Sequence, residues 1–150
     1  MKTTSSRAQQ KGMSLLEGLL AVLIFSVGIL ALVALQGTSV RATTEAKMRA
    51  DASFHASQLV ARMWTDALNL TNYSYNTGNP GDPGCAFTAG GGNHAAVVAW
   101  AADVQAALPG AIAQVIVTND ALVTNLIAIT ICWPSGNETR RFQTVTQINF

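Results

Sequence analysis

Residues 18–40 have the sequence GLLAVLIFSVGILALVALQGTSV, which is 23 residues without a charged side chain. A helix rises about 1.5 Å per residue, so a helix of this length spans the roughly 30 Å of hydrocarbon in a bilayer. The first twelve residues contain Lys2, Arg7 and Lys11 and no acid, and such an excess of cations marks a cytoplasmic flank. The sequence therefore predicts one membrane-spanning helix, with residues 1–12 in the cytoplasm and the C-terminal part outside it.

A cleaved secretory signal peptide is the alternative interpretation of this region. The three cations would form its charged part, and cleavage would follow a small residue near Ala34 or Ala42. Against this interpretation, the apolar run is longer than the usual 7 to about 15 residues. In addition, Glu17 stands at its start and the helical pattern continues past its end. We therefore favour a membrane span.

Composition excludes several classes of protein. The chain has 150 residues, which is the size of one ordinary domain. Its residues are 49% apolar and 11% charged, which excludes an intrinsically disordered chain. Beyond residue 12 there are six basic and eight acidic side chains, and a nucleic-acid surface would need clustered cations instead. We expect one folded unit without a direct nucleic-acid site.

Glu17 is unusual because it lies at the start of an apolar helix. A charge within a membrane helix costs about 2.5–3.5 kcal/mol on insertion scales, so it usually has a partner. Gly12 and Met13 lie just upstream, and a cut between them would create an α-amine at Met13, one helical turn from the Glu17 carboxylate. In a bundle, that carboxylate could pair with the amine of a neighbouring subunit and fix the axial register. The other interpretation places Glu17 simply at the level of the lipid headgroups.

Residues 11–17, with the sequence KGMSLLE, and the uncharged segment after them resemble the class III signal of type IV prepilins and type II secretion pseudopilins. That signal combines a basic leader, a Gly before the cut, a Glu in the fifth place after it and a long apolar helix. Within this superfamily, residues 12–17 and 24–32 most resemble the minor pilins called type IV pilus modification proteins. The resemblance covers residues 11–68 well and the remainder loosely.

The resemblance implies a set of site residues. Prepilin peptidase would remove the leader, residues 1–12, by cutting between Gly12 and Met13, and Met13 would then be N-methylated. Glu17 would be the assembly carboxylate. Major pilins commonly have Phe where this chain has Met13 and a Pro inside the apolar segment, whereas the first proline here is Pro80. These two departures from the pattern concern methylation and the usual local bend.

The resemblance also implies the architecture and the partners. The fold would be α+β and pilin-like, a long N-terminal helix packed on a small antiparallel sheet. Residues 13–40 would be the transmembrane and assembly helix, residues 41–70 its amphipathic continuation, and residues 71–150 the exposed globular domain. The partners would be the major pilin, other minor pilins, prepilin peptidase and the inner-membrane assembly platform. The protein would lie in the bacterial inner membrane and then near the tip of the pilus fibre.

Helical periodicity continues beyond the apolar run. An apolar stripe is predicted from the residues Ala56, Leu59, Val60, Met63, Ala67 and Leu70, with Trp64 also assigned to the core. The opposite, solvated face is predicted from Arg41, Glu45, Lys47, Arg49, Asp51, Arg62 and Asp66. Glu45 and Arg49 are spaced as a favourable i, i+4 ion pair.

The segment 71–93 breaks this pattern, because 17 of its 23 residues are Thr, Ser, Asn, Asp, Gly or Pro. This composition predicts an exposed loop, which is either a binding surface or a tolerated insertion. Its Gly90-Gly91-Gly92 run lacks the Lys-Ser or Lys-Thr that follows in a phosphate loop, so we reject nucleotide binding there.

The C-terminal part predicts one short helix and three strands. Val97, Ala101, Val104 and Leu108 have helical spacing, and Pro109-Gly110 ends that helix. Strands are predicted at 111–118, 122–133 and 139–150 by their β-branched residues and alternation. Alternation places Ile127, Ile129, Ile131 and Trp133 on one face of one strand, and it places Phe142, Thr144, Thr146, Ile148 and Phe150 together in the next. An antiparallel sheet of this kind can pack on the exposed half of the long helix.

Cys85 and Cys132 are the only cysteines, with 46 residues between them. Once the topology places this domain outside the cytoplasm, a disulfide is the natural expectation. In the chain-entropy model it stabilises by roughly 4 kcal/mol. The alternative is two buried, unpaired thiols.

Residue patterns for catalysis are missing from the sequence. His55 and His94, the only histidines, are not in a metal-ligand spacing, and a dyad of Cys85 with His94 would require a free thiol. We predict a protein that is not an enzyme and needs no cofactor or metal. The expected function is a minor pilin that promotes pilus assembly, with effects on adhesion, twitching motility or DNA uptake that come with the family. The alternatives are a minor pseudopilin of a type II secretion system and an uncleaved, single-span binding protein.

Overall fold

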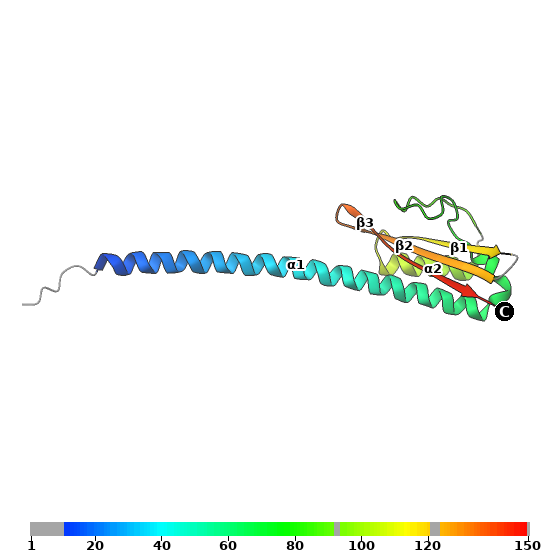
Figure 1. Ribbon diagram of the computed structural model, residues 1–150, viewed down its shortest axis with the longest axis horizontal. Coiled ribbons are helices and arrows are strands. Elements are labelled where there is room, and N and C mark those ends of the chain that lie inside the picture. Colours follow the sequence, from blue (N-terminus) through cyan, green and yellow to red (C-terminus); the bar gives the residue numbers. More distant parts are fainter. Residues whose placement is uncertain (1–10, 92–93, 121–123, 150) are drawn as a thin grey trace, which may run out of the picture. The chain divides into compact units, whose positions relative to one another are not determined.

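The structure is a computed structural model, and it describes residues 11–91, 94–120 and 124–149 (Figure 1). The chain divides into two compact units, one ending at Thr43 and one beginning at Thr44. The elements are α1 (Lys11–Thr65), the 3₁₀ helix η1 (Ala67–Tyr73), α2 (Ala95–Ala107), β1 (Ile112–Asp120), β2 (Thr124–Ser135) and β3 (Glu138–Ile148). The chain is therefore α+β, with a long N-terminal helix and a small sheet, as predicted.

The N-terminal unit is helical throughout its described part. It belongs to α1, which begins at Lys11 and runs without interruption through the uncharged segment. Every residue from 15 to 43 is exposed, so no other element in the described part of this unit covers the helix. The predicted helix is confirmed here, while residues 1–10 of the predicted leader lie outside the described residues.

The predicted continuation of α1 to residue 70 was wrong, because the helix ends at Thr65. Asp66 has φ −126° and ψ 42°, outside the helical region, and its N–H donates to Met63 O at 3.2 Å. Short polar side chains such as Asp compete with the helix for hydrogen bonds, which favours an ending at this point. The chain then enters η1, which buries Leu70 and Tyr73.

The sheet has the strand order β1-β2-β3 and is antiparallel throughout. In its register Val115 pairs with Ile129, and Ile129 pairs with Thr144. A two-residue turn at Gly136 and Asn137 joins β2 to β3, and the φ of Gly136, 63°, lies in the left-handed region that glycine adopts without strain. All three predicted strands are confirmed apart from their ends, although residues 122, 123 and 150 lie outside the described residues.

The hydrophobic core belongs to the C-terminal unit and is formed by α1, η1, α2 and the inner face of the sheet. It includes Ala52, Ala56, Leu59 and Met63 of α1, Val97, Trp100, Ala101 and Val104 of α2, and Ile127, Ile129, Ile131 and Trp133 of β2. Trp100 is fully buried, and its Nε1 donates to the backbone oxygen of His55 at 2.8 Å. This bond ties α2 to α1 where the two helices meet, and it satisfies a polar atom that burial would otherwise leave unpaired.

Two predictions about the faces of α1 were wrong. Trp64 is 52% exposed although its neighbour Met63 is fully buried. Consecutive helix residues differ by about 100° in direction, so they do not share a face. The predicted solvated face was also wrong in part, because Glu45, Asp51, Arg62 and Asp66 are half-buried. Its members Arg41, Lys47 and Arg49 are exposed, as expected.

Candidate functional site

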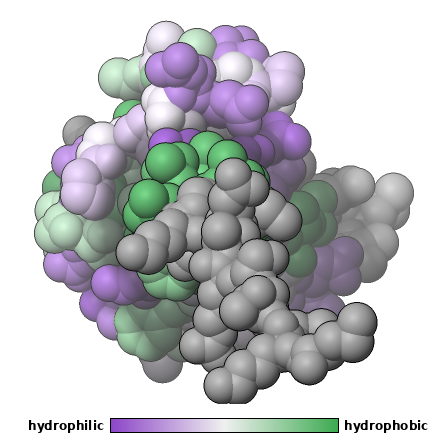
Figure 2. Space-filling view, turned by 90° about the vertical axis from the view of Figure 1, so that its left-hand side faces the viewer, coloured by the Kyte–Doolittle hydropathy of each residue, from purple (hydrophilic) through white to green (hydrophobic). Residues whose placement is uncertain are grey.

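The apolar segment of α1 is the most prominent surface of the N-terminal unit. Its large apolar side chains from Leu15 to Leu35 are between 45% and 77% exposed. Figure 2, a view from the left-hand side of Figure 1, shows hydrophobic residues in green around the centre of the view. Among the described residues, α1 is the one helix long and apolar enough to cross a membrane by length and composition. Contiguous apolar surface of this extent marks a membrane or protein contact.

Two hydroxyl side chains of this segment, Ser26 and Thr38, form hydrogen bonds within the helix itself. The Ser26 hydroxyl donates to the backbone oxygens of Val22 and Leu23, and the Thr38 hydroxyl donates to Leu35 O at 2.8 Å. Such local bonds satisfy these two hydroxyl donors without water. These residues are therefore compatible with lipid or with a dry helix bundle, despite their polarity.

The predicted processing residues all lie in the first two turns of α1. Gly12 and Met13 have helical backbone, but the side chains of residues 11–14 lie outside what the structure describes. Glu17 is exposed and has no ion pair with any residue in the described part of the chain. Its side chain thus lies on the exposed surface of the helix.

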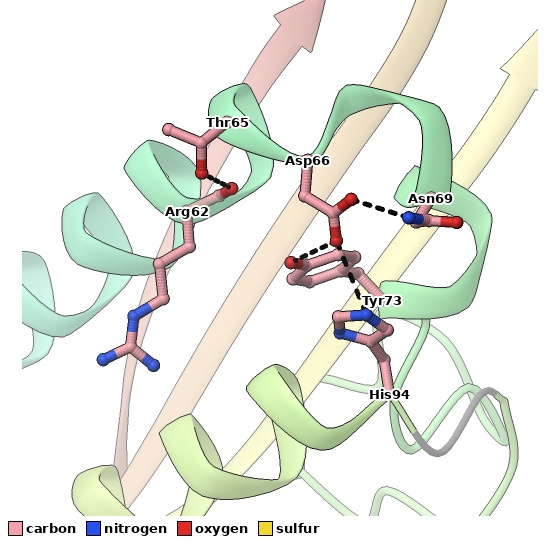
Figure 3. Close-up of polar contacts among 6 residues, drawn as sticks. All are labelled: Arg62, Thr65, Asp66, Asn69, Tyr73 and His94. Atoms are coloured by element: carbon pink, nitrogen blue, oxygen red, sulfur yellow. Dashed lines mark hydrogen bonds and ion pairs between the residues drawn. The ribbon is translucent and has the colours of Figure 1, made fainter.

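A second candidate site surrounds Asp66, where three elements of the C-terminal unit meet (Figure 3). Asp66 Oδ1 accepts a hydrogen bond from Asn69 Nδ2 at 2.7 Å, and Oδ2 accepts one from the Tyr73 hydroxyl at 3.1 Å. His94 Nε2 lies 3.5 Å from Oδ2, and the centroids of the His94 and Tyr73 rings are 4.4 Å apart. We call these four residues the Asp66 cluster.

The Asp66 cluster has the properties of a structural clasp. The Asn69 hydrogen bond is the main cause of a lowered pKa at Asp66, and the Tyr73 hydroxyl and His94 add to it. Burial and the hydrogen bond to Asp66 raise the pKa of Tyr73. Within the described residues, no group of three His, Cys, Asp or Glu side chains could hold a metal ion. The cluster joins the end of α1 to η1 and to the start of α2.

Sequence reasoning missed the Asp66 cluster. Asp66 was assigned to a solvated helix face, and His94 was considered as a metal ligand and as the partner of Cys85 in a dyad. The two residues are 28 apart in sequence and on opposite sides of the 71–93 segment, so no local pattern connects them. Only the spacing of Asp66 and Asn69, typical of a helix end, was available as a signal.

The clasp predicts a pH-dependent stability. Folding lowers the pKa of Asp66, so the ionised carboxylate contributes to the free energy of unfolding. This contribution is present above the unfolded pKa of about 3.9 and is lost as the pH falls through the lower, folded value. We expect the melting temperature of the wild type to fall more than that of Asp66→Asn when the pH is lowered from 6 to 3. Differential scanning fluorimetry of the detergent-solubilised chain measures this difference. Asp103→Asn, at an exposed position of α2, is the control and should follow the wild type.

The predicted exposed loop is in fact anchored over β1 by the side chain of Gln114. Gln114 is 1% exposed, and its Nε2 donates to Asn76 O at 2.7 Å and to Gly78 O at 3.3 Å. Its Oε1 accepts a hydrogen bond from Gly81 N at 3.2 Å. Asn76 Nδ2 donates in return to Ala113 O at 2.9 Å. The first half of the loop is therefore held to the sheet by a buried amide with partners at both ends.

The disulfide predicted between Cys85 and Cys132 is present and anchors the middle of the loop. The Cα atoms of the two cysteines are 6.3 Å apart, and both residues are buried. At the far end, Gly91 forms a bridge with Tyr75, which also bridges to Val115. A Cβ at Gly91 would lie 2.5 Å from Ser74 O, so only glycine fits this contact. The loop is therefore attached to the sheet by the Gln114 hydrogen bonds, by the disulfide and by the bridges of Tyr75.

Glu45 joins α1 to the turn between β2 and β3. The Ser135 hydroxyl donates to Glu45 Oε2 at 2.9 Å, and Arg140 Nε lies 3.6 Å from Glu45 Oε1. Arg140 also pairs with Glu138 at 3.1 Å. Glu45 thus contacts the hairpin rather than Arg49, the partner predicted from helical spacing. Both charged partners of Arg140 remain partly exposed, so these pairs position the hairpin more than they stabilise it.

No family model, curated protein or solved structure matches the chain. A function therefore has to be inferred from the residues of the chain itself. The features that carry such an inference are the exposed apolar helix, Glu17 at its start, and the disulfide in the C-terminal unit.

Proposed function

We propose that the chain is a minor pilin of the type IV pilus, similar to PilV, and that prepilin peptidase processes it between Gly12 and Met13. The observation that carries this proposal is the position of Glu17. It is a lone acid in the fifth place after a Gly-Met bond, at the start of an uncharged helix that is exposed along its length. A membrane anchor alone has no use for this carboxylate, whereas an assembly of cleaved helices does.

Cleavage changes the electrostatics at the start of the helix. Hydrolysis of the Gly12–Met13 peptide bond creates a free α-amine on Met13, which is a cation near neutral pH. The Glu17 carboxylate of one subunit then pairs with the Met13 amine of a neighbour, and the two charges leave water together. Register follows, because a helix shifted along the fibre axis would leave both groups unpaired in an apolar environment.

The same apolar surface serves in two environments. Before assembly it lies in the bacterial inner membrane, with the N-terminus in the cytoplasm. After cleavage it leaves lipid for the helices of the major pilin and other minor pilins, with the help of the inner-membrane assembly platform. The disulfide supports this topology, because disulfides persist outside the cytoplasm. In this role the protein primes or promotes fibre assembly near the tip, and so contributes to adhesion, twitching motility or DNA uptake.

The mature N-terminus tests the proposal. Intact-mass and N-terminal peptide analysis of protein from sheared surface filaments should find a chain that begins at Met13. Gly12→Leu should block the cut and keep the protein in the membrane. Gly18→Ala is the matched control, because a Cβ at Gly18 meets no atom within 4 Å. A chain that still carries Met1, or that begins near residue 35 or 43, contradicts the proposal and favours an uncleaved anchor or a signal peptide.

A minor pseudopilin of a type II secretion system would give the same mature N-terminus, because it shares the same signal. The two functions differ in the assembly that contains the protein. Deletion of the gene should reduce the number of surface pili and leave secretion of folded exoproteins unchanged. The opposite result would assign the chain to the secretion system.

A further inference from the structure

The outward face of α1 in the C-terminal unit carries an apolar surface that the core does not use. Phe54, Ser57, Ala61 and Trp64 follow one another at spacings of three, four and three residues, which places them along one side of the helix. Phe54 is 64% exposed and Trp64 is 52% exposed. We call these four residues the outer stripe. It lies opposite the helix face that contributes Ala52, Ala56, Leu59 and Met63 to the core.

This face of the helix carries no charge. Among residues 50–65 the exposed positions are Ala50, Phe54, Ser57, Ala61, Trp64 and Thr65. The charged residues of the same stretch, Asp51 and Arg62, are half-buried at its margins. A surface helix normally presents charged and polar side chains to water, and a helix that is apolar on opposite faces is usually covered on both. The outer stripe therefore has the composition of an interface.

The size of the outer stripe limits its partner. If a large aromatic side chain buries about 200 Å², then Phe54 at 64% and Trp64 at 52% exposed offer roughly 230 Å² together. A stable, free-standing protein interface needs about 800 Å² per partner. The outer stripe is therefore too small to bind a partner from solution by itself. It can bind a partner that other contacts already keep nearby, such as a second chain anchored in the same membrane.

We propose that the outer stripe binds the outer stripe of a second copy of this chain. This inference rests on the membrane anchoring of the proposed function. Two copies inserted in the same orientation have their C-terminal units on the same side of the membrane, and each outer stripe begins the same number of residues after the apolar segment. Because the membrane confines both chains, each outer stripe meets the other at a high effective concentration. This high concentration compensates for the small area of the contact. An uncharged stripe also meets its own copy without like-charge repulsion.

The test measures cross-linking between full-length chains in membranes. Ser57→Cys places one free thiol in the middle of the outer stripe, and a short bismaleimide reacts with this thiol but not with the disulfide-bonded cysteines. The control is Asn137→Cys, which places the thiol in the exposed turn between β2 and β3. All variants carry Gly12→Leu, so that the result is independent of peptidase cleavage. We expect at least fivefold more covalent dimer from Ser57→Cys than from Asn137→Cys.

A second comparison separates a specific contact from crowding in the membrane. Adding Phe54→Ser and Trp64→Ser to Ser57→Cys should lower the dimer yield to that of the Asn137→Cys control. Both side chains are more than half exposed, and formation of the native disulfide reports that the unit still folds. Equal yields from Ser57→Cys and Asn137→Cys overturn the proposal. So do an unchanged yield in the serine variant and a cross-link to a different protein in place of the dimer. None of these outcomes depends on where the mature N-terminus begins.

Discussion

The double variant Cys85→Ser, Cys132→Ser should lose about 4 kcal/mol of unfolding free energy in the C-terminal unit, according to the chain-entropy model for a closed loop of this size. The disulfide joins residues 47 apart in sequence, so its removal frees a large part of the unfolded chain. For a unit of about 100 residues, each kcal/mol lowers the melting temperature by roughly 4 °C or more, so we expect a decrease of at least about 15 °C. Thermal unfolding in detergent, with and without dithiothreitol, measures it.

The same variant should distinguish the anchors of the loop. Residues near Gly78 are still held by the hydrogen bonds of Gln114, whereas the segment around Cys85 loses its attachment to β2. Limited proteolysis should therefore cut between residues 79 and 90 before it cuts the sheet. Reduced wild type is the matched control and should behave like the serine variant. If reduction leaves both the melting temperature and the cleavage pattern unchanged, the disulfide does not anchor the loop.

The parts of the fold that sequence reasoning predicted are those in which local pattern and burial agree. In β2, alternation alone placed Ile127, Ile129, Ile131 and Trp133 on one face, and all four are buried. The same holds for α2, where helical spacing selected four residues that enter the core. Apolar side chains that repeat with the period of a helix or strand lie on one face of it. The sequence alone therefore indicates which residues are buried.

The parts that were missed depend on contacts between distant segments. The end of α1 at Thr65 is accompanied by the Asp66 cluster, whose members Tyr73 and His94 come from η1 and from the boundary of α2. Likewise, nothing in the sequence around Gln114 indicates that its amide is buried beneath residues 76–81. From sequence alone, a polar residue in a strand is predicted to face solvent, because its hydrogen-bond partners are not known. Burial of a satisfied polar group is decided by the tertiary fold.

The candidate functional residues also differ in whether a local sequence pattern identifies them. Glu17 and the residues around it were selected by a local pattern, and the structure adds that this carboxylate is exposed on an exposed helix. The outer stripe was hidden by an assumption, because Trp64 was assigned to the core and charged residues were assigned to the outward face. In the structure, Trp64 is exposed and the exposed positions of this face carry no charge.

Glu17→Ala should leave membrane insertion intact and strongly reduce incorporation into fibres. Removing a charge from the apolar helix lowers the cost of insertion by about 2.5–3.5 kcal/mol, so the membrane-bound precursor should accumulate normally. In the proposed fibre, the variant leaves the Met13 amine of a neighbour unpaired in an apolar environment. Breaking a buried ion pair in this way costs about 3–5 kcal/mol, which corresponds to a loss of roughly 100-fold or more.

The measurement is the ratio of the protein in sheared filaments to the protein in membranes, determined by quantitative immunoblot. Glu17→Gln is the matched control for size, and it should fail like Glu17→Ala because it cannot carry the charge. Glu17→Asp retains the charge on a shorter side chain and should recover part of the incorporation. If Glu17→Gln enters filaments as well as the wild type does, charge pairing with Met13 is not what selects the subunit, and Glu17 acts at the level of the headgroups instead.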